Sequence, residues 1–125
     1  MPDFLAEGSD TLATFSTTIL AATANGTSAI ITPLNMHLVG IQMPSTWTAA
    51  NLTFQANLDG GAALYNCYDN SGTEIIITAA ASRYIFIPPT LLARMQSLIV
   101  RSGTSGTPVQ QGGDRIITLL FGKYS

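Results

Sequence analysis

Short stretches in which apolar and polar residues alternate, each closed by turn-forming residues, recur about every 8–12 residues from position 13 onward. The clearest is NLTFQANLDGG at 51–61, where the alternation stops at Asp59-Gly60-Gly61. A period of two is typical of a strand with one face against a core. Four side chains of this stretch are therefore expected to point inward: Leu52, Phe54, Ala56 and Leu58.

The same pattern predicts about eight strands, together with one short helical turn at LLARMQ (91–96), after a Pro-Pro-Thr break. Asn25-Gly26 is expected to form a hairpin turn, because both residues tolerate positive φ. The connections are too short for helical crossovers, so the strands should pair antiparallel and form an all-β sandwich. The candidate strand segments are 13–21, 29–32, 37–43, 51–58, 63–68, 73–79, 83–87, 97–102 and 114–121.

At 125 residues, the chain is expected to form one domain, over residues 13–125, with a single core. Its charged fraction, 10%, is well below the usual quarter, while the apolar fraction, 46%, is ordinary. A small domain that stays alone in water normally carries more charges, because charge opposes association. The scarcity of charge therefore favours a subunit of an assembly, expected as a homo-oligomer. The alternative is a weakly charged, Thr-rich secreted domain.

Several classes of partner are not expected. Five basic residues, spread from Arg83 to Lys123, cannot form the cationic stripe that nucleic-acid binding needs. No stretch approaches the roughly 20 apolar residues of a membrane span, and MPDFLAEGSD has acids where a secretory signal needs a basic region. Cys67 is the one cysteine, so no internal disulfide is expected and the chain should fold in a reducing cytoplasm.

Residues 1–12 are interpreted as an N-terminal arm, because Pro2, Gly8 and three acidic residues interrupt any periodic pattern. Phe4 and Leu5 give this arm a small apolar anchor. Terminal segments are ordered mainly where something holds them. Phe4 and Leu5 are therefore candidate interface residues that bind a neighbouring subunit. The alternative is that they cap the core of their own chain.

The ionisable residues suggest no catalytic or metal-binding set, so an enzyme is not expected and no cofactor is expected. Cys67 and His37 are the one pair that can be drawn as nucleophile and base, but such chemistry needs a third group to orient the imidazole. One His, one Cys and scattered carboxylates do not supply a zinc set. Asp59 and Asp69 lie in turns where a calcium site is conceivable, but their Gly and Asn neighbours explain them as turn formers.

Three aromatic residues with a polar group are candidate binding residues. Trp47 lies in a predicted loop, where it is either a sugar-stacking platform or an interface anchor. Tyr65 and Tyr68, in and after the next predicted strand, are weaker candidates for ligand binding. For Trp47, the alternative is a structural role in which the indole closes one end of the sandwich.

Residues 39–102 resemble short structural proteins encoded by tailed phages and prophages. The stretches that carry this resemblance are VGIQMPSTWTAANLTFQANLDGG, YDNSGTEIIITAAASRYIFIPP and LIVRSGTSGTPVQQ. The succession of strand, Trp-bearing loop, LTFQA-like strand and DGG turn is also similar to galactose-binding-like jelly rolls of the discoidin type. The resemblance covers about half the chain and implies a virion component with a jelly-roll domain. It contains no catalytic motif, and it matches no ligand-binding loop residue.

The scarcity of charge and the resemblance together predict a phage virion structural protein, most specifically a capsid decoration or cement protein that binds and stabilises neighbouring capsid subunits. Its expected partners are the major capsid protein or other virion proteins, which it joins after synthesis in the host cytoplasm. Deletion of residues 1–12 is expected to weaken this attachment. The alternative function is a carbohydrate- or receptor-binding module of a tail tip or fibre, with Trp47 and neighbouring loops as the glycan platform.

Overall fold

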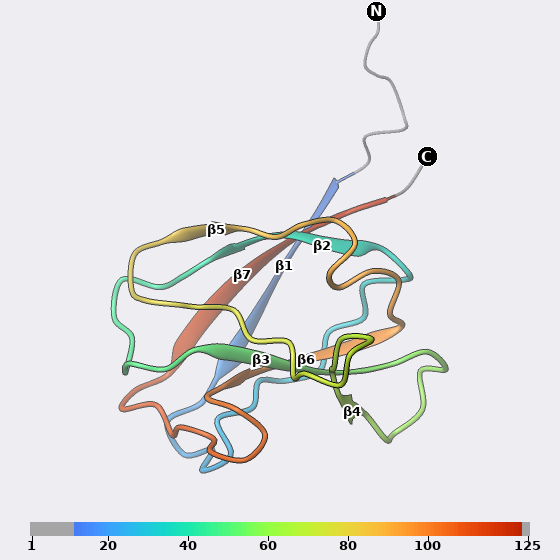
Figure 1. Ribbon diagram of the computed structural model, residues 1–125. Coiled ribbons are helices and arrows are strands. Elements are labelled where there is room, and N and C mark those ends of the chain that lie inside the picture. The colour runs from blue at the N-terminus through green and yellow to red at the C-terminus, as the bar shows by residue number, and fades with distance from the viewer. Residues whose placement is uncertain (1–11, 124–125) are drawn as a thin grey trace, which may run out of the picture.

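The computed structural model describes residues 12–123, which form two antiparallel sheets packed face to face, with no helix among them (Figure 1). The predicted all-β sandwich is confirmed. One sheet has the strand order β1-β7-β2-β5 and the other β4-β3-β6. Nothing in residues 12–123 forms a membrane-crossing helix. The strands are β1 (Leu12–Ile19), β2 (His37–Gln42), β3 (Leu52–Asn57), β4 (Tyr65–Asn66), β5 (Tyr84–Phe86), β6 (Ser97–Ser102) and β7 (Arg115–Gly122).

The strand pairing is that of a chain folded back on itself as one long hairpin and then wrapped into two sheets. β1 pairs with β7, β2 with β5 and β3 with β4, all antiparallel. Residues 27–31 supply an eighth position, because Thr27 bridges to Arg101 and Ile31 to Leu98, both in β6. In chain order the eight segments are β1, residues 27–31, β2, β3, β4, β5, β6 and β7. The first segment pairs with the eighth, the second with the seventh, the third with the sixth and the fourth with the fifth. This order is that of a jelly roll.

The hairpin predicted at Asn25-Gly26 is wrong. β1 pairs along its whole length with β7, and one isolated bridge joins it to the segment that follows. Residues 20–26 instead cross to the other sheet through two successive turns. Gly26 has φ +66°, and its backbone lies so close to Ser102 and Val109 that a Cβ would have no room. Asn25-Gly26 does turn the chain, but packing of distant segments decides which strands pair.

The helical turn predicted at 91–96 is also wrong. This segment forms turns and bends, and Arg94 adopts φ +57°, which no α-helical residue has. The carbonyl oxygens of Leu92 and Met95 accept N–H groups from β2 and from the loop before it. Pairing with these distant segments takes the backbone acceptors that a helix would have used.

Three predicted strands are shorter than expected. Of residues 63–68, only Tyr65–Asn66 forms a strand. Residues 73–79 contribute isolated bridges at Glu74 and Ile77, and residues 29–32 contribute a single bridge. These segments lie along the edges of the three-stranded sheet, where few of their backbone groups meet a partner in register.

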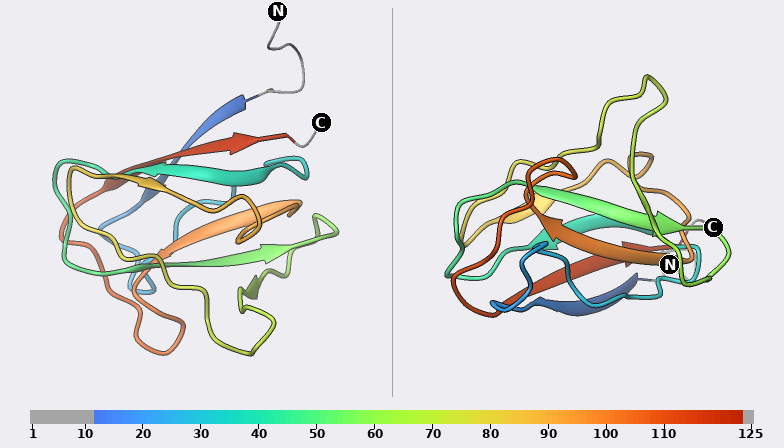
Figure 2. Two further views of the ribbon diagram at one scale, coloured as in Figure 1. Left: turned by 45° about the horizontal axis from the view of Figure 1, so that its top comes forward. Right: turned by 90° about the horizontal axis from the view of Figure 1, so that it is seen from below.

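The apolar core lies between the two sheets, which Figure 2 shows as separate layers. In β3, Leu52 and Phe54 point inward as predicted, but Leu58 is 82% exposed, because the strand ends at Asn57 and the chain turns away. Thr53 and Asn57, which alternate with these residues, are nevertheless buried. Thr53 Oγ1 donates to the Gly103 carbonyl oxygen and accepts from Arg101, and the Asn57 amide donates to the carbonyl oxygens of Gly61 and Ala63. The fully buried apolar side chains are Ile19, Leu38, Ile41, Leu52, Phe54, Leu98, Val100, Ile117, Leu119 and Phe121.

β2 departs from simple alternation because its register against β7 shifts between Leu38 and Gly40. The extra residue of a bulge changes the side to which the preceding side chains point. Leu38 and Ile41 are therefore both in the core, although they are three positions apart and would face opposite sides of a regular strand. Met43 is buried, whereas Val39 is only half-buried.

Candidate functional site

The outer face of the four-stranded sheet carries no charged side chain on any of its described strands. Sheets that face water usually display charges, which keep them soluble and block pairing with other chains. Here the cross-strand rows combine hydroxyl, amide, aliphatic and aromatic side chains. We refer to this surface as the uncharged face. Its residues are Leu12, Thr14, Ser16 and Thr18 of β1, Ile116, Thr118, Leu120 and Gly122 of β7, His37, Gly40 and Gln42 of β2, and Tyr84 and Phe86 of β5. The His37 ring is buried beside Gly122 and Leu12, and this burial lowers the pKa of its imidazole, which favours the neutral form.

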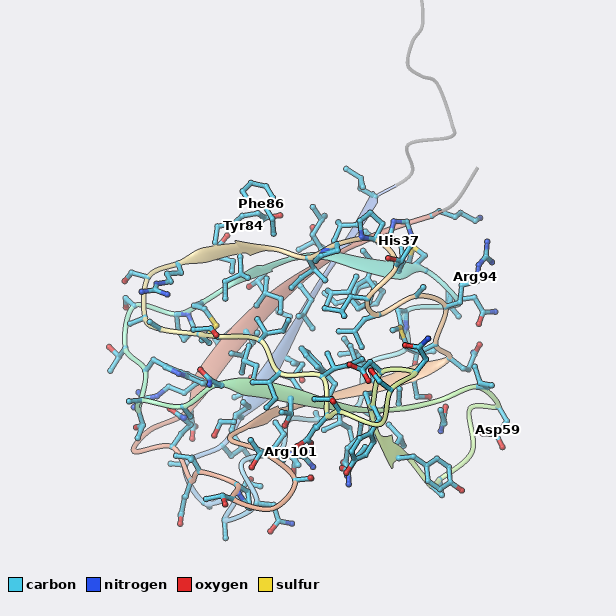
Figure 3. All side chains as sticks on the ribbon, viewed as in Figure 1. His37, Asp59, Tyr84, Phe86, Arg94 and Arg101 are labelled. Carbon is cyan, nitrogen blue, oxygen red and sulfur yellow. The ribbon has the colours of Figure 1, made fainter. Side chains whose placement is uncertain are left out.

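Two aromatic rings stand on the β5 edge of the uncharged face. Phe86 is 82% exposed, and Figure 3 shows Phe86 and Tyr84 pointing away from the sandwich. Their ring centroids lie 4.9 Å apart in an edge-to-face arrangement. The Tyr84 hydroxyl lies directly over Gly40, where a Cβ would overlap it. The absence of a side chain at Gly40 therefore lets the Tyr84 ring lie across the sheet. Tyr84 and Phe86 are exposed and alternate with the less exposed Ile85 and Ile87, as expected of a strand.

An apolar hollow of about 510 Å³ opens between the β3–β4 region and residues 91–95. Buried Leu92 and Met95 line its inner part, and exposed Leu58 stands at its mouth. Two of the predicted ligand-binding residues, Tyr65 and Tyr68, line it as well and are 69% and 52% exposed. The structure thus brings these two tyrosines to one site. Its complete lining is Ala56, Asn57, Leu58, Tyr65, Asn66, Cys67, Tyr68, Ile75, Leu91, Leu92, Ala93, Arg94 and Met95.

Trp47, the third candidate, does not line this hollow. Its indole is half-buried against the core, and Nε1 donates a hydrogen bond to the carbonyl oxygen of Ala50 at 3.0 Å. The next residue, Thr48, is held by the buried side chain of Gln111, which accepts from the Thr48 N–H at 2.8 Å and donates to its carbonyl oxygen at 3.0 Å. The Trp47 loop is thereby tied to the long loop before β7. Phe4 and Leu5 lie outside the described residues, as does the predicted arm except Leu12, which begins β1.

A buried ion pair lies on the outer side of the three-stranded sheet. Arg101 Nη2 is 2.9 Å from a carboxylate oxygen of Glu74, and both side chains are largely buried. The guanidinium also donates to Thr53 Oγ1 and Asn66 Oδ1, each at 2.9 Å. The backbone N–H of Ser105 donates to the Glu74 carboxylate. Because these donors and acceptors satisfy one another, the cluster has a structural character: it links Asn66 and Glu74 to β6 and to the loop that follows it.

Cys67 and His37 come from different parts of the fold. Cys67 lies beside β3, and burial raises the pKa of its thiol to about 11, against a smaller lowering by Arg101. His37 begins β2 in the other sheet, where burial and, secondarily, the charge of Arg94 lower the pKa of its imidazole below 6.5. At neutral pH the thiol is protonated, whereas a nucleophilic cysteine needs a lowered pKa.

Asp59 and Asp69 each accept hydrogen bonds from residues of their own turn. Asp59 Oδ1 accepts a hydrogen bond from the Gly61 N–H at 3.0 Å. Asp69 Oδ1 accepts from the N–H groups of Ser71 and Thr73 and from the Ser71 hydroxyl, and these bonds lower the pKa of its carboxyl. Among residues 12–123, no three His, Cys, Asp or Glu side chains come together as metal ligands.

No protein-family model and no curated protein matches the chain. Among solved structures, it is similar to a protein from Bacillus endospore appendages, which are described as a novel family of disulfide-linked pili. The two are 16% identical, the alignment covers 100% of this chain and 99% of that chain, and the TM-score is 0.36. A likeness at this TM-score decides neither fold nor role. The jelly roll is therefore assigned from strand pairing alone.

Proposed function

We propose that the protein is a phage virion structural protein, of the capsid decoration or cement type, that binds neighbouring capsid subunits through the uncharged face. The uncharged face is the observation that carries this proposal. A sheet face without charges loses little when it is covered, whereas each buried, unpaired charge costs several kcal/mol. Contiguous exposed apolar surface commonly marks a protein interaction site. The setting in a virion is supported by the resemblance of residues 39–102 to phage structural proteins.

The two aromatic rings of β5 are the expected anchors of this contact. Aromatic side chains dominate binding energy where they become fully covered. Phe86, at 82% exposure, has the most area to gain. Because β5 is an edge strand paired with β2 on one side, its other edge is also open to a partner.

The proposal is tested by the occupancy of the protein on purified particles and by its dependence on Phe86. Replacement of Phe86 by Asp is expected to weaken attachment by about tenfold or more, since covering such a side chain is worth roughly 1.5–3 kcal/mol. Ile76→Asp is the matched control, because Ile76 is exposed but lies outside the uncharged face. Circular dichroism verifies that both variants fold. Unchanged occupancy of Phe86→Asp, or a few copies per particle instead of hundreds, would contradict the proposal.

A second candidate function is a carbohydrate- or receptor-binding module of a tail tip or fibre. It is favoured by Tyr65 and Tyr68, which are exposed and line one hollow. Tyrosine offers a sugar both a flat apolar ring and a hydroxyl. Glycan-array binding that is lost in Tyr68→Ala but kept in Phe86→Asp would favour this function over attachment to a capsid.

A further inference from the structure

We propose that the apolar hollow binds residues Phe4 and Leu5 of a second copy of this chain, so that copies join arm to hollow. This contact is separate from the uncharged face and goes beyond the proposed function, since it joins copies of the protein to one another. The hollow needs an apolar occupant. Apart from Arg94, all of its lining side chains are uncharged, and most are apolar. Its volume, about 510 Å³, is within the range of specific binding pockets.

The exposure around the hollow points to a site that is covered by another chain. At the mouth of the hollow, Leu58 is 82% exposed, and the Tyr65 and Tyr68 side chains are also exposed. Leu92 and Met95, deeper in the hollow, are buried. An aromatic and an aliphatic side chain entering together would cover all three exposed groups. Phe4-Leu5 is such a pair, placed in an acidic segment.

Charge complements shape in this match. Residues 1–11 contain three acidic residues and no basic one, a charge of −3, whereas the rest of the chain has five basic and four acidic residues, a charge of +1. Phe4-Leu5 is flanked by Asp3 and Glu7. The single charged residue of the hollow is the cation Arg94. The proposed occupant is therefore acidic, and the one charged side chain in the lining of the hollow is basic.

The chain enters the fold at the end that carries the hollow. Leu12 is paired with Gly122, and Gly122 with His37 at the start of β2. The next residue of β2, Leu38, donates its N–H to the carbonyl oxygen of Leu92 in the hollow wall. Figure 3 shows His37 and Arg94 on this same side of the molecule.

The segment before Leu12 is long enough to reach a second copy. Leu5 lies seven residues before Leu12, which corresponds to up to roughly 25 Å of extended chain. β1 begins on the side of the sandwich away from β4, which lines the molecule's own hollow (Figure 1). The hollow of a neighbouring copy is therefore the proposed acceptor.

The test measures self-association of the full chain by sedimentation equilibrium. Phe4→Ala/Leu5→Ala and, separately, Leu58→Asp are each expected to weaken association by about tenfold or more. Leu34→Asp is the matched control, because it is the same change at another exposed leucine that does not line the hollow. Circular dichroism verifies that each variant is folded.

A mixing experiment then distinguishes a second copy from the same chain. The double alanine variant keeps its hollow, and Leu58→Asp keeps its arm, so an equimolar mixture is expected to regain one-to-one pairs that neither variant forms alone. The proposal is overturned by a monomeric full chain, by folded variants that associate like the wild type, by an equal loss in Leu34→Asp, or by a mixture that forms no pairs. These results are independent of particle occupancy in Phe86→Asp, which tests the proposed function.

Discussion

Burial determines how the ionisable side chains of this protein behave. Arg101 is buried, and each of its donating nitrogens meets an acceptor on Thr53, Asn66 or Glu74. The neighbouring Cys67 is half-buried near the same charges, with its Sγ 3.9 Å from the Tyr65 carbonyl oxygen. Burial disfavours the thiolate more than the nearby Arg101 favours it. The thiol is therefore held in its unreactive form.

Native Cys67 is expected to react slowly with iodoacetamide at pH 8. The thiolate is the reacting species, and the native pKa of about 11 lies above the roughly 8.5 of an unfolded cysteine. The native rate should be about two to three orders of magnitude below the rate in denaturant, and it should rise steadily toward pH 11. Mass spectrometry of the alkylated chain gives both rates. Equal rates in the two states would show that the thiol is not suppressed.

The segments between strands depend on a few glycines that allow close backbone approach. Gly103 follows β6 with φ +91°, and a Cβ there would lie 2.5 Å from the Thr107 carbonyl oxygen and 2.7 Å from the Val109 nitrogen. Gly72 has a similar φ of +87°, but a Cβ there would have nothing within 4 Å. The two positions share the conformational requirement, and only Gly103 adds a steric one.

Alanine substitution is expected to separate these two requirements. Gly72→Ala should lower the free energy of unfolding by about 1–2 kcal/mol, the cost of a left-handed backbone for a residue with a Cβ. Gly103→Ala should cost about 1–3 kcal/mol more, because the backbone of the loop must move. Urea denaturation of both variants measures the difference. An equal loss at the two positions would mean that the loop after β6 accommodates the methyl group.

The two outer faces of the molecule are unlike each other. Residues 66–77 run along the β3 edge of the three-stranded sheet, and the Arg101–Glu74 ion pair links them to β6 on its outer side. The outer face of the four-stranded sheet has no charge on its described strands. The Arg101–Glu74 ion pair thus lies on one side of the sandwich and the uncharged face on the other, where we propose that the protein meets a partner.

Attachment through the uncharged face should depend little on salt. Ions screen interactions between charges, and the Debye length falls from about 30 Å at 0.01 M to about 3 Å at 1 M ionic strength. Affinity for particles is therefore expected to change by less than about threefold between about 0.05 and 0.5 M NaCl. Co-sedimentation with particles at each salt concentration measures it. A steep fall in binding would assign the contact to charged residues elsewhere on the surface.

Alternation in the sequence located the long strands and, for most of them, which side chains enter the core. Phe15, Thr17 and Ile19 share the inner face of β1, and Leu98 and Val100 that of β6, because side chains on a strand alternate regardless of its partner. The scarcity of charge likewise follows from the sequence. The alternation misleads where a bulge shifts the register, as at Leu38, where a neighbouring side chain buries a polar residue, as Arg101 does at Thr53, or where the strand has ended, as at Leu58.

Only the tertiary structure decided which strands meet. Pairing of β1 with β7 joins the two ends of the described chain, and no local signal encodes a contact between residues so far apart. Together with the pairing of β2 with β7 and with β5, it aligns the uncharged residues of these four strands into one face. Elsewhere in the fold, Leu58, Tyr65 and residues 91–95 come together around one hollow. In the sequence, the residues of the uncharged face and of the hollow lie in separate loops and strands. They form continuous surfaces only because the jelly roll brings distant segments side by side.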